Sequence, residues 1–256
     1  MTFDPALLDA LRIARHVMVF TGAGVSQESG IPTFRDTLTG LWSTFDPERL
    51  ATPQAFAHQP NLVWGWYEFR RAAVLRCQPN PAHKAIAEMA AQVPTLTLVT
   101  QNVDDLHERA GSPGVLHLHG SLHQPRCSAC GLPFALPPGI PDEPEGGRSL
   151  PPPRCPHCDG PVRPGVVWFG ESLPEGAWAQ ACRAARSCDL LFSVGTSSVV
   201  YPAAELPFMA DEAGATIVQV NPHPTDLDRV TDHTLAGKAG DILPRLVHAA
   251  WGGLYA

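Results

Sequence analysis

The chain has 256 residues, of which 44% are hydrophobic and 17% are charged, and its formal net charge at pH 7 is −7. This composition is typical of a folded globular protein, and the length allows one large domain or one domain with an insertion. The net negative charge argues against nucleic acid as a partner, and no apolar run approaches the roughly 20 residues of a membrane helix. We therefore expect a cytoplasmic protein that binds neither nucleic acid nor membranes.

Apolar segments alternate with helical segments along the chain. Residues 4–16 have the pattern of an amphipathic helix, and the apolar run 17–20 follows them. Similar runs, typical of parallel strands covered by helices on both faces, lie at 96–100, 190–194 and 216–220. Helical patterns separate these runs at 81–92, 173–185 and 201–214. The alternation predicts the α/β class, with a Rossmann-type, doubly wound parallel sheet.

Two segments interrupt this alternation. Residues 37–80 are rich in aromatic residues and punctuated by prolines, which predicts short helices that form a cap. Residues 131–154 contain eight prolines and four glycines, which predicts an irregular loop. We expect both to belong to one smaller domain, made of a helical insertion at 37–94 and a second module at 123–161. The larger domain would then comprise 1–36, 95–122 and 162–256.

A glycine-rich turn follows the first apolar run, in the sequence TGAGVSQESGIPTFR (21–35). Gly22 and Gly24 lack side chains, so backbone amides could approach and bind a pyrophosphate here. The turn departs from the Rossmann fingerprint GxGxxG at Gln27, and glycine turns after strands also occur for purely steric reasons. Arg35 could pair with a phosphate or order the turn over a cofactor; the alternative is a surface salt bridge.

Polar residues follow the other apolar runs. Amides and carboxylates come after 96–100, namely Gln101, Asn102, Asp104 and Asp105. Such a cluster is costly to bury without a ligand, although Asn and Asp taken singly also cap helices. Small and amide residues come after the last two runs, namely Gly195, Thr196, Ser197 and Asn221. Since ligands bind at the carboxyl ends of parallel strands, the set predicts an uncharged, hydrogen-bonding cleft for a dinucleotide.

Two histidines in VLHLHGS (115–121) are candidates for proton transfer. Strand-like alternation would place His117 and His119 on one face. The pKa of histidine suits a general base near neutral pH, and an HxH pair can also bind a metal. For His117 we expect a structural role.

Two CxxC units offer four thiolates to one tetrahedral metal ion, from Cys127, Cys130, Cys155 and Cys158. Four protein ligands leave no open position for water or substrate, so we infer one structural zinc ion that does not catalyse. Redox use of the two pairs is the alternative.

The motifs together resemble those of the sirtuin family over nearly the whole chain. They occur in the family's order: GAGVSQESGIPTFR (22–35), TQNVDDLHERAG (100–111), HLHG (117–120), the two CxxC units, PGVVWFGE (164–171), GTSSVVYPA (195–203) and VQVN (218–221). The resemblance implies a Rossmann-type domain with a smaller domain of zinc module and helices. It also implies an enzyme that removes acyl groups from protein lysines and consumes NAD, with nicotinamide and O-acyl-ADP-ribose as products.

The resemblance also implies roles for individual residues. The diphosphate and the nicotinamide ribose would be held by Gly22, Ala23, Gly24, Thr33, Phe34 and Arg35. The adenosine side would be contacted by Gly195, Thr196, Ser197 and Asn221, with Ala239 near the adenine. Gln101, Asn102 and Asp104 would orient the ribose and nicotinamide. His119 would be the base that deprotonates a ribose hydroxyl.

Tyr67 and Arg70, in WGWYEFRRAAV (64–74), resemble the Tyr-x-x-Arg of sirtuins that remove succinyl and malonyl groups. The guanidinium would pair with the distal carboxylate of the acyl group, and the phenol would add a hydrogen bond. Ala51 resembles the small residue that widens the acyl tunnel in that subgroup. The alternative is an exposed helical pair. An apolar stretch could line the tunnel or pair with an extended peptide, through Val166, Val167, Phe169 and Gly170.

We expect a monomer whose partners are acylated lysine side chains of proteins and peptides, with desuccinylation faster than deacetylation. Three other functions compete with this one. They are an NAD-dependent oxidoreductase that transfers hydride, a zinc-dependent hydrolase that uses the HxH pair, and a non-catalytic module that binds NAD or a peptide.

Overall fold

The computed structural model describes residues 2–32, 46–144 and 147–252. Six strands form one parallel sheet in the order β3-β2-β1-β6-β7-β8. In chain order they are β1 (His16–Thr21), β2 (Thr95–Thr100), β3 (Leu116–His117), β6 (Leu190–Val194), β7 (Thr216–Asn221) and β8 (His233–Ala236). The strand order reverses beside β1, which is the arrangement of a doubly wound fold with its switch point between β1 and β6. The predicted α/β class and parallel sheet are therefore confirmed.

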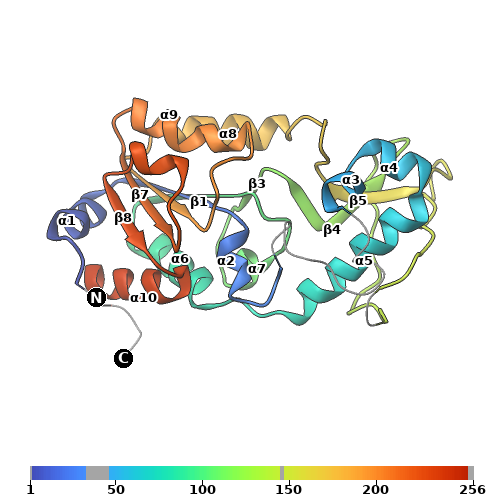
Figure 1. Cartoon of the computed structure of the whole chain (residues 1–256), viewed down its shortest axis with the longest axis horizontal. Coiled ribbons are helices and arrows are strands. Elements are labelled where there is room, and N and C mark those ends of the chain that lie inside the picture. Colours follow the sequence, from blue (N-terminus) through green and yellow to red (C-terminus); the bar gives the residue numbers. More distant parts are fainter. Residues whose placement is uncertain (1, 33–45, 145–146, 253–256) are drawn as a thin grey trace.

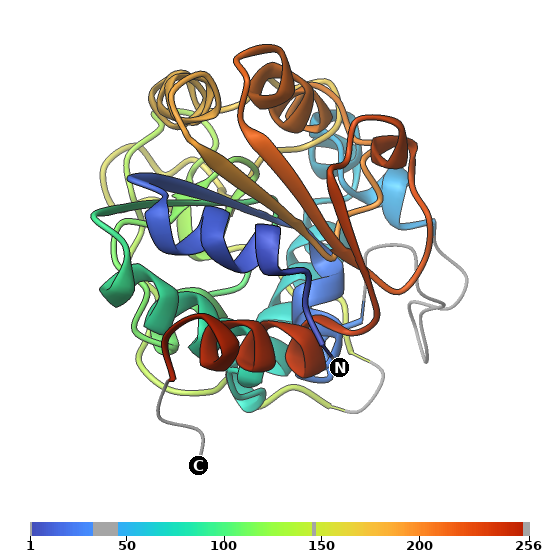
Figure 2. The ribbon, with the colours of Figure 1, turned by 90° about the vertical axis from the view of Figure 1, so that its left-hand side faces the viewer.

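Helices cover both faces of this sheet (Figure 2). One face packs against α1 (Pro5–Ile13), α6 (Pro81–Gln92) and α10 (Ala239–Trp251), with Leu11, Ile86 and Leu246 buried among the strand residues. The other face packs against α8 (Glu175–Ala185) and α9 (Leu206–Glu212), a helix that follows the short 3₁₀ turn η2 (Ala203–Glu205). The predicted helix over 201–214 is thus divided, and α9 begins only at Leu206. Covering on both faces explains why the central strands are mainly apolar.

Local signals in the sequence set the ends of several helices. Asn80 caps α6, because its side chain accepts a hydrogen bond from the amide of Ala82, and Pro81 fits the first helical position. At the other end of the chain, Gly252 adopts the left-handed conformation that commonly ends a helix, here α10. These caps set the start of α6 and the end of α10.

A second group of elements lies at the far end of the molecule from α1 and α10 (Figure 1). It contains α3 (Pro47–Leu50), α4 (Pro53–His58), α5 (Pro60–Arg76) and the antiparallel pair β4 (Gly120–Cys127) and β5 (Val162–Val166). Their shared core includes Phe56, Trp66, Tyr67 and Trp168. The expectation of only short helices is wrong for α5, which runs for 17 residues because Pro60 starts it and no further proline occurs before Pro79.

The proline-rich segment crosses α5 at Gly65. The amide of Leu150 donates to the carbonyl of Asn61 at 2.9 Å, and a Cβ placed on Gly65 would lie 2.0 Å from the carbonyl oxygen of Arg148. No helix or strand occurs in the described part of 131–154, as its composition predicts. Position 65 must be glycine, although it lies in the middle of a helix, because a side chain there would collide with the backbone of this loop.

Gly65→Ala is expected to lower the free energy of unfolding by about 1 to 3 kcal/mol, the usual cost of overpacking. The oxygen that it meets belongs to the backbone and cannot rotate away. Gly176→Ala in α8 is the matched control, because no atom lies within 4 Å of its added Cβ. The control should be neutral or stabilise by up to about 1 kcal/mol. Urea unfolding of both variants measures the difference, and equal stabilities would contradict the packing described here.

Within the described ranges, no helix combines the length and the apolar character that a membrane crossing demands.

Candidate active site

The loops that follow four strands are held together at the carboxyl edge of the sheet. Hydrogen bonds between main-chain groups continue beyond the strand ends: Gly22 donates to Val194 at 3.0 Å, Gln101 to Thr21 at 2.9 Å, and Gly195 to Val220 at 3.0 Å. The residues after β1, β2, β6 and β7 therefore share one surface, as the topology predicts.

Gly22 and Gly24 bring the loops after β1 and β6 into close contact. A Cβ on Gly22 would lie 2.8 Å from the Cβ of Thr196, and one on Gly24 would lie 2.7 Å from the carbonyl oxygen of Gly195. Gly195 itself has a φ of +59°, which favours glycine. The close approach of the two loops therefore requires glycine at both positions, as the steric interpretation of this turn predicts. It leaves Ala23 exposed at the start of α2 (Ala23–Gln27), beside the same edge.

Uncharged side chains join the loops after β2, β6 and β7. Gln101 Nε2 donates to Thr196 Oγ1 at 2.9 Å, and Asn221 Nδ2 donates to the carbonyl of Thr196 at 2.7 Å. Ser197 is exposed beside them. Ala239 is buried at the first position of α10, and the next residue, Gly240, is bonded to Glu28 just after α2. The predicted amide and hydroxyl groups thus come together, whereas Thr33, Phe34 and Arg35 lie outside the described residues.

Asn102 and Asp104 are buried directly below this edge. Asn102 Nδ2 donates to Ser26 Oγ at 3.0 Å. Asp104 accepts a hydrogen bond from the amide of Leu106 at 3.1 Å, so it also stabilises the turn into α7 (Leu106–Arg109), although the N-cap residue of α7 is Asp105 and has no side-chain cap. Burial raises the pKa of Asp104, and these hydrogen bonds only partly offset the effect. Asp105 does not join them, because its carboxylate pairs with Arg109 and His123.

His119 presents a neutral imidazole to this edge. Its Nδ1 lies 3.0 Å from the carbonyl oxygen of Gln101, so Nδ1 carries the proton and Nε2 keeps a lone pair. Burial lowers the pKa of His119, against the opposing effect of that hydrogen bond. A half-buried imidazole that is neutral at pH 7 can accept a proton through Nε2.

His117 differs from His119 in both contacts and charge. Its Nδ1 bonds the carbonyl of Asn102 at 3.0 Å, and its Nε2 lies 2.6 Å from Glu108 Oε1, so both ring nitrogens are engaged. Burial alone would lower the pKa of His117, but the hydrogen bond and charge of Glu108 raise it overall. The expectation of one strand face for both histidines is wrong, because β3 ends at His117. The two rings instead bond different carbonyls.

The segment after β5 connects His119 with the helical part of the molecule. Val167 donates its amide to the carbonyl of His119 at 2.9 Å, and Phe169 donates to the carbonyl of Ala51 at 2.9 Å. Between them, the indole of Trp168 donates to the phenol oxygen of Tyr67 at 3.0 Å. Val166 is buried at the end of β5, whereas Phe169 is 49% exposed and Gly170 follows it on the surface. The predicted apolar stretch thus contacts both His119 at the sheet edge and the helical segment that contains Ala51 and Tyr67.

Tyr67 and Arg70 face inward from α5. Tyr67 is buried, and burial raises its pKa to about 12. Arg70 is half-buried, with its guanidinium carbon 5.0 Å from the centre of the Trp66 ring. Burial lowers the pKa of Arg70, while the nearby Tyr67 and Asp104 oppose this change. The exposed-pair alternative does not describe Tyr67, which is buried.

The four cysteines of the CxxC units converge, with all sulfur atoms within 4.8 Å of one another. Two of the separations are 3.4 Å, between Cys127 and Cys158, and 3.7 Å, between Cys130 and Cys155. A tetrahedral ion with Zn–S bonds of about 2.3 Å needs sulfurs about 3.8 Å apart. Both units make the same turn, because a left-handed residue follows the second cysteine of each, Gly131 or Asp159. The donor set therefore fits one zinc ion with four protein ligands.

The sequence did not single out the polar residues beneath this edge. Thr21, Ser26, His83, Thr100 and His107 are all buried there. For His83 a signal exists, since it lies three residues before Ile86 and so shares the apolar face of α6.

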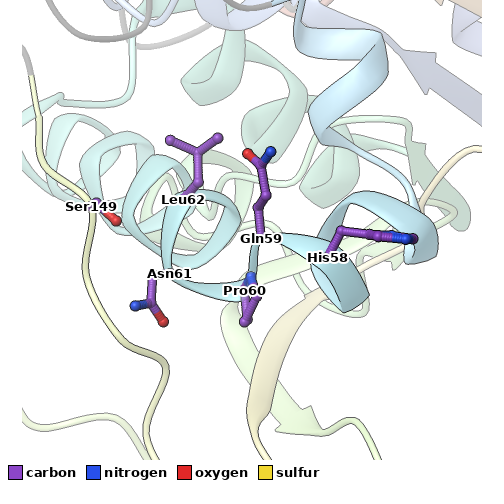
Figure 3. A pocket seen from close by; sticks show the side chains of 6 residues that line it. All are labelled: His58, Gln59, Pro60, Asn61, Leu62 and Ser149. Carbon is purple, nitrogen blue, oxygen red and sulfur yellow. The ribbon is translucent and has the colours of Figure 1, made fainter.

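A separate hollow lies at the junction of α4 and α5 (Figure 3). It has a volume of about 410 Å³ and is lined by His58, Gln59, Pro60, Asn61, Leu62 and Ser149. No group of residues suited to proton transfer or metal binding is gathered in it, so we place the candidate active site at the sheet edge.

Comparison with known proteins gives consistent matches. The Sir2 family model matches residues 22–202. Over 249 residues the chain is 63% identical to an NAD-dependent protein deacylase of Methylococcus capsulatus, covering 97% of this chain and 98% of that protein. It is 59% identical to NAD-dependent protein deacylase 1 of Pseudomonas aeruginosa, with coverage of 97% and 99%. A solved complex of a Sir2 homologue with NAD superposes with a TM-score of 0.86 at 45% identity, covering 97% of this chain and 94% of that one.

Proposed function

Because the chain belongs to the Sir2 family, we propose that it is an NAD-dependent protein deacylase. It would remove succinyl and malonyl groups, and also acetyl groups, from lysine side chains of proteins and peptides, with nicotinamide and O-acyl-ADP-ribose as products. The observation that carries this proposal is the neutral imidazole of His119 beside the buried Asn102 and Asp104. We also propose that it acts as a monomer.

The groups at the sheet edge suit NAD as the co-substrate. NAD supplies a ribose whose bond to nicotinamide breaks when the acyl oxygen reacts. The amides and hydroxyls after β6 and β7 would bind its adenosine side, through Gly195, Thr196, Ser197 and Asn221, with Ala239 close by. Gly22, Ala23 and Gly24, with Thr33, Phe34 and Arg35, would bind the diphosphate and the nicotinamide ribose.

The catalytic roles follow from the protonation states. Gln101, Asn102 and Asp104 would orient the ribose and nicotinamide by hydrogen bonds. His119 would accept the proton of a ribose hydroxyl at Nε2, since Nδ1 already bonds the carbonyl of Gln101. General-base assistance of this kind contributes about 10²- to 10⁴-fold.

The acyl preference would be set by Tyr67 and Arg70. The oxygen of Tyr67 accepts a hydrogen bond from Trp168, which leaves the phenol proton to donate to a ligand. A half-buried guanidinium beside it favours acyl groups that end in a carboxylate. The neighbouring Arg71 is paired with the buried Glu68 at 2.8 Å, so the proposal assigns this role to Arg70 and not to Arg71. Ala51 would widen the tunnel, and the segment Val166, Val167, Phe169 and Gly170 would line it.

We further propose that residues 1–36, 95–122 and 162–256 form the NAD-binding domain. The smaller domain would combine 37–94 with the zinc module 123–161. In this division His119, in the larger domain, and Tyr67, in the smaller one, approach the acyl-lysine from two sides.

Matched peptides test the acyl preference directly. One sequence carrying succinyl-lysine or acetyl-lysine is incubated with NAD, and the deacylated peptide is followed by mass spectrometry. We expect a higher kcat/KM for the succinyl peptide. Equal values for both peptides would overturn the proposed preference.

The pH dependence should follow His119. Its pKa lies below the ordinary value of 6.5, so the base stays neutral at pH 7, and activity should fall only when the pH drops below about 6.5. A profile of kcat/KM between pH 5 and 8 measures this acidic limb. A limb that begins above pH 7 would contradict a buried, neutral His119.

Loss of one zinc ligand should affect stability and not chemistry. Cys155→Ser is expected to bind less than one zinc ion per chain and to have a lower Tm than the wild-type protein, because four thiolates complete the site. Cys182→Ser is the control, since Cys182 lies outside the cluster. Elemental analysis and thermal unfolding measure both effects. Unchanged zinc content in Cys155→Ser would contradict the assignment.

A further inference from the structure

Two buried histidines lie behind the candidate active site without a role in the proposed reaction. His83 on α6 and His107 on α7 have their ring centres 4.8 Å apart, and neither ring is exposed to solvent. Burial lowers the pKa of His83 to about 4 and the pKa of His107 well below its ordinary value. Both imidazoles are therefore neutral at pH 7, and each has one N–H group to donate.

His83 is connected to the side chain of Asn102 through Ser26. Its Nε2 lies 3.4 Å from Ser26 Oγ, and Asn102 Nδ2 donates to the same oxygen at 3.0 Å. Hydrogen bonding to Ser26 also lowers the pKa of Asp104. A hydroxyl has one proton, so when Ser26 gives it to Asp104, its oxygen must accept from both Asn102 and His83. In that arrangement the proton of His83 is on Nε2.

His107 is connected to the backbone of Asn102 through two threonines. Its Nε2 lies 3.0 Å from Thr21 Oγ1, which donates to Thr100 Oγ1 at 2.8 Å. Thr100 Oγ1 also accepts the backbone N–H of Asn102 at 3.0 Å. The two threonines face each other because β1 and β2 pair in register at these positions. Since Thr21 donates toward Thr100, it accepts from His107, whose proton is also on Nε2.

We propose that His83 and His107 are positioning residues that aim Asn102 and Asp104 at the ligand. His83 orients the Ser26 hydroxyl, which contacts the side chain of Asn102. His107 orients the two threonine hydroxyls that lead to the backbone N–H of Asn102. Within the described residues, the Nδ1 atoms of both rings have no hydrogen-bond partner. Each ring is therefore connected to Asn102 through its Nε2 atom alone. The inference rests on the proposed function, because it concerns residues that would orient NAD.

Substitutions at His83 separate positioning from packing. His83→Gln places an amide N–H near the position of Nε2, whereas His83→Asn places it near Nδ1 and His83→Phe fills the space without a donor. We expect His83→Gln to keep at least about half of the wild-type kcat. His83→Asn and His83→Phe should each lose about tenfold in kcat, the effect of one lost hydrogen bond, with KM for the acylated peptide changed less than about twofold.

A double-variant cycle tests the route through Ser26. In a Ser26→Ala background, His83→Phe should change kcat by less than about twofold, because the hydroxyl that it orients is gone. Effects that multiply in the double variant, or a loss in His83→Gln as large as in His83→Phe, would overturn the proposal. If His83→Phe does not fold, the comparison of the Gln and Asn variants decides the question alone.

Failure of the proposed function gives a different result. A wild-type protein that deacylates none of the peptides would refute the deacylase and leave the positioning network to be judged by NAD binding. Calorimetry with NAD should then give the same order, with His83→Gln close to wild type and the Asn and Phe variants weaker by about tenfold. Equal affinities for NAD would overturn the positioning role.

Discussion

Replacing His119 by alanine is expected to lower kcat for deacylation by about 10²- to 10⁴-fold. The variant loses the Nε2 lone pair that would accept the ribose proton, while the carbonyl of Gln101, which bonds Nδ1, lies in a half-exposed region where water can replace that contact. Initial rates of nicotinamide release, measured with saturating NAD and acylated peptide, give the change in kcat. The affinity for NAD should change much less than kcat.

His58→Ala is the control for this experiment. His58 is an exposed histidine on α4 and lines the separate hollow at the start of α5. It should keep the wild-type kcat. A His119→Ala enzyme that retains more than about a tenth of that rate would show that another group is the base.

Arg70→Ala is expected to lower kcat/KM for a succinyl-lysine peptide by about 10- to 100-fold, and to leave the value for the acetyl-lysine peptide unchanged or higher. The first effect is the loss of a charge-assisted contact with the distal carboxylate, worth about 1.5 to 3 kcal/mol. The second follows because an acetyl group offers no charge to balance a half-buried guanidinium. Initial rates with each peptide alone, at concentrations well below KM, give both values.

Two further variants sharpen the test at α5. Tyr67→Phe removes the proposed donor and should lower the preference for the succinyl group by a smaller factor than Arg70→Ala. Arg76→Ala removes an exposed arginine from the end of the same helix and should change neither value. If Arg70→Ala lowered the rates for both peptides equally, Arg70 would support the fold of the site and not recognise the acyl group.

Physical reasons explain which parts of the fold were predictable. The run 190–194 coincides with β6, because a central strand buried on both faces is made mainly of apolar residues, here all but Ser193. β8 has no such run, since its residues are alternately half-exposed and exposed at the edge of the sheet. β3 has only two residues and leaves no periodic signal.

The site shows a similar division. The polar residues after the strands, such as Gln101 and Asn221, were predictable because parallel strands bring their carboxyl ends together. The link from His119 through Val167 to Ala51 was not, since main-chain hydrogen bonds between distant segments leave no trace in residue types. The two threonines under Asn102 were missed for a related reason. Thr21 and Thr100 fit a strand on propensity alone, so only their pairing reveals the hydrogen bond.

The central claim is that acyl removal and cleavage of NAD are one reaction at this sheet edge. The most direct measurement is the stoichiometry of products when the intact protein acts on NAD and a succinyl-lysine peptide, determined by mass spectrometry. We predict equal amounts of free-lysine peptide, nicotinamide and O-succinyl-ADP-ribose, and none without NAD. Free lysine produced without nicotinamide, or NADH formed in its place, would contradict the account.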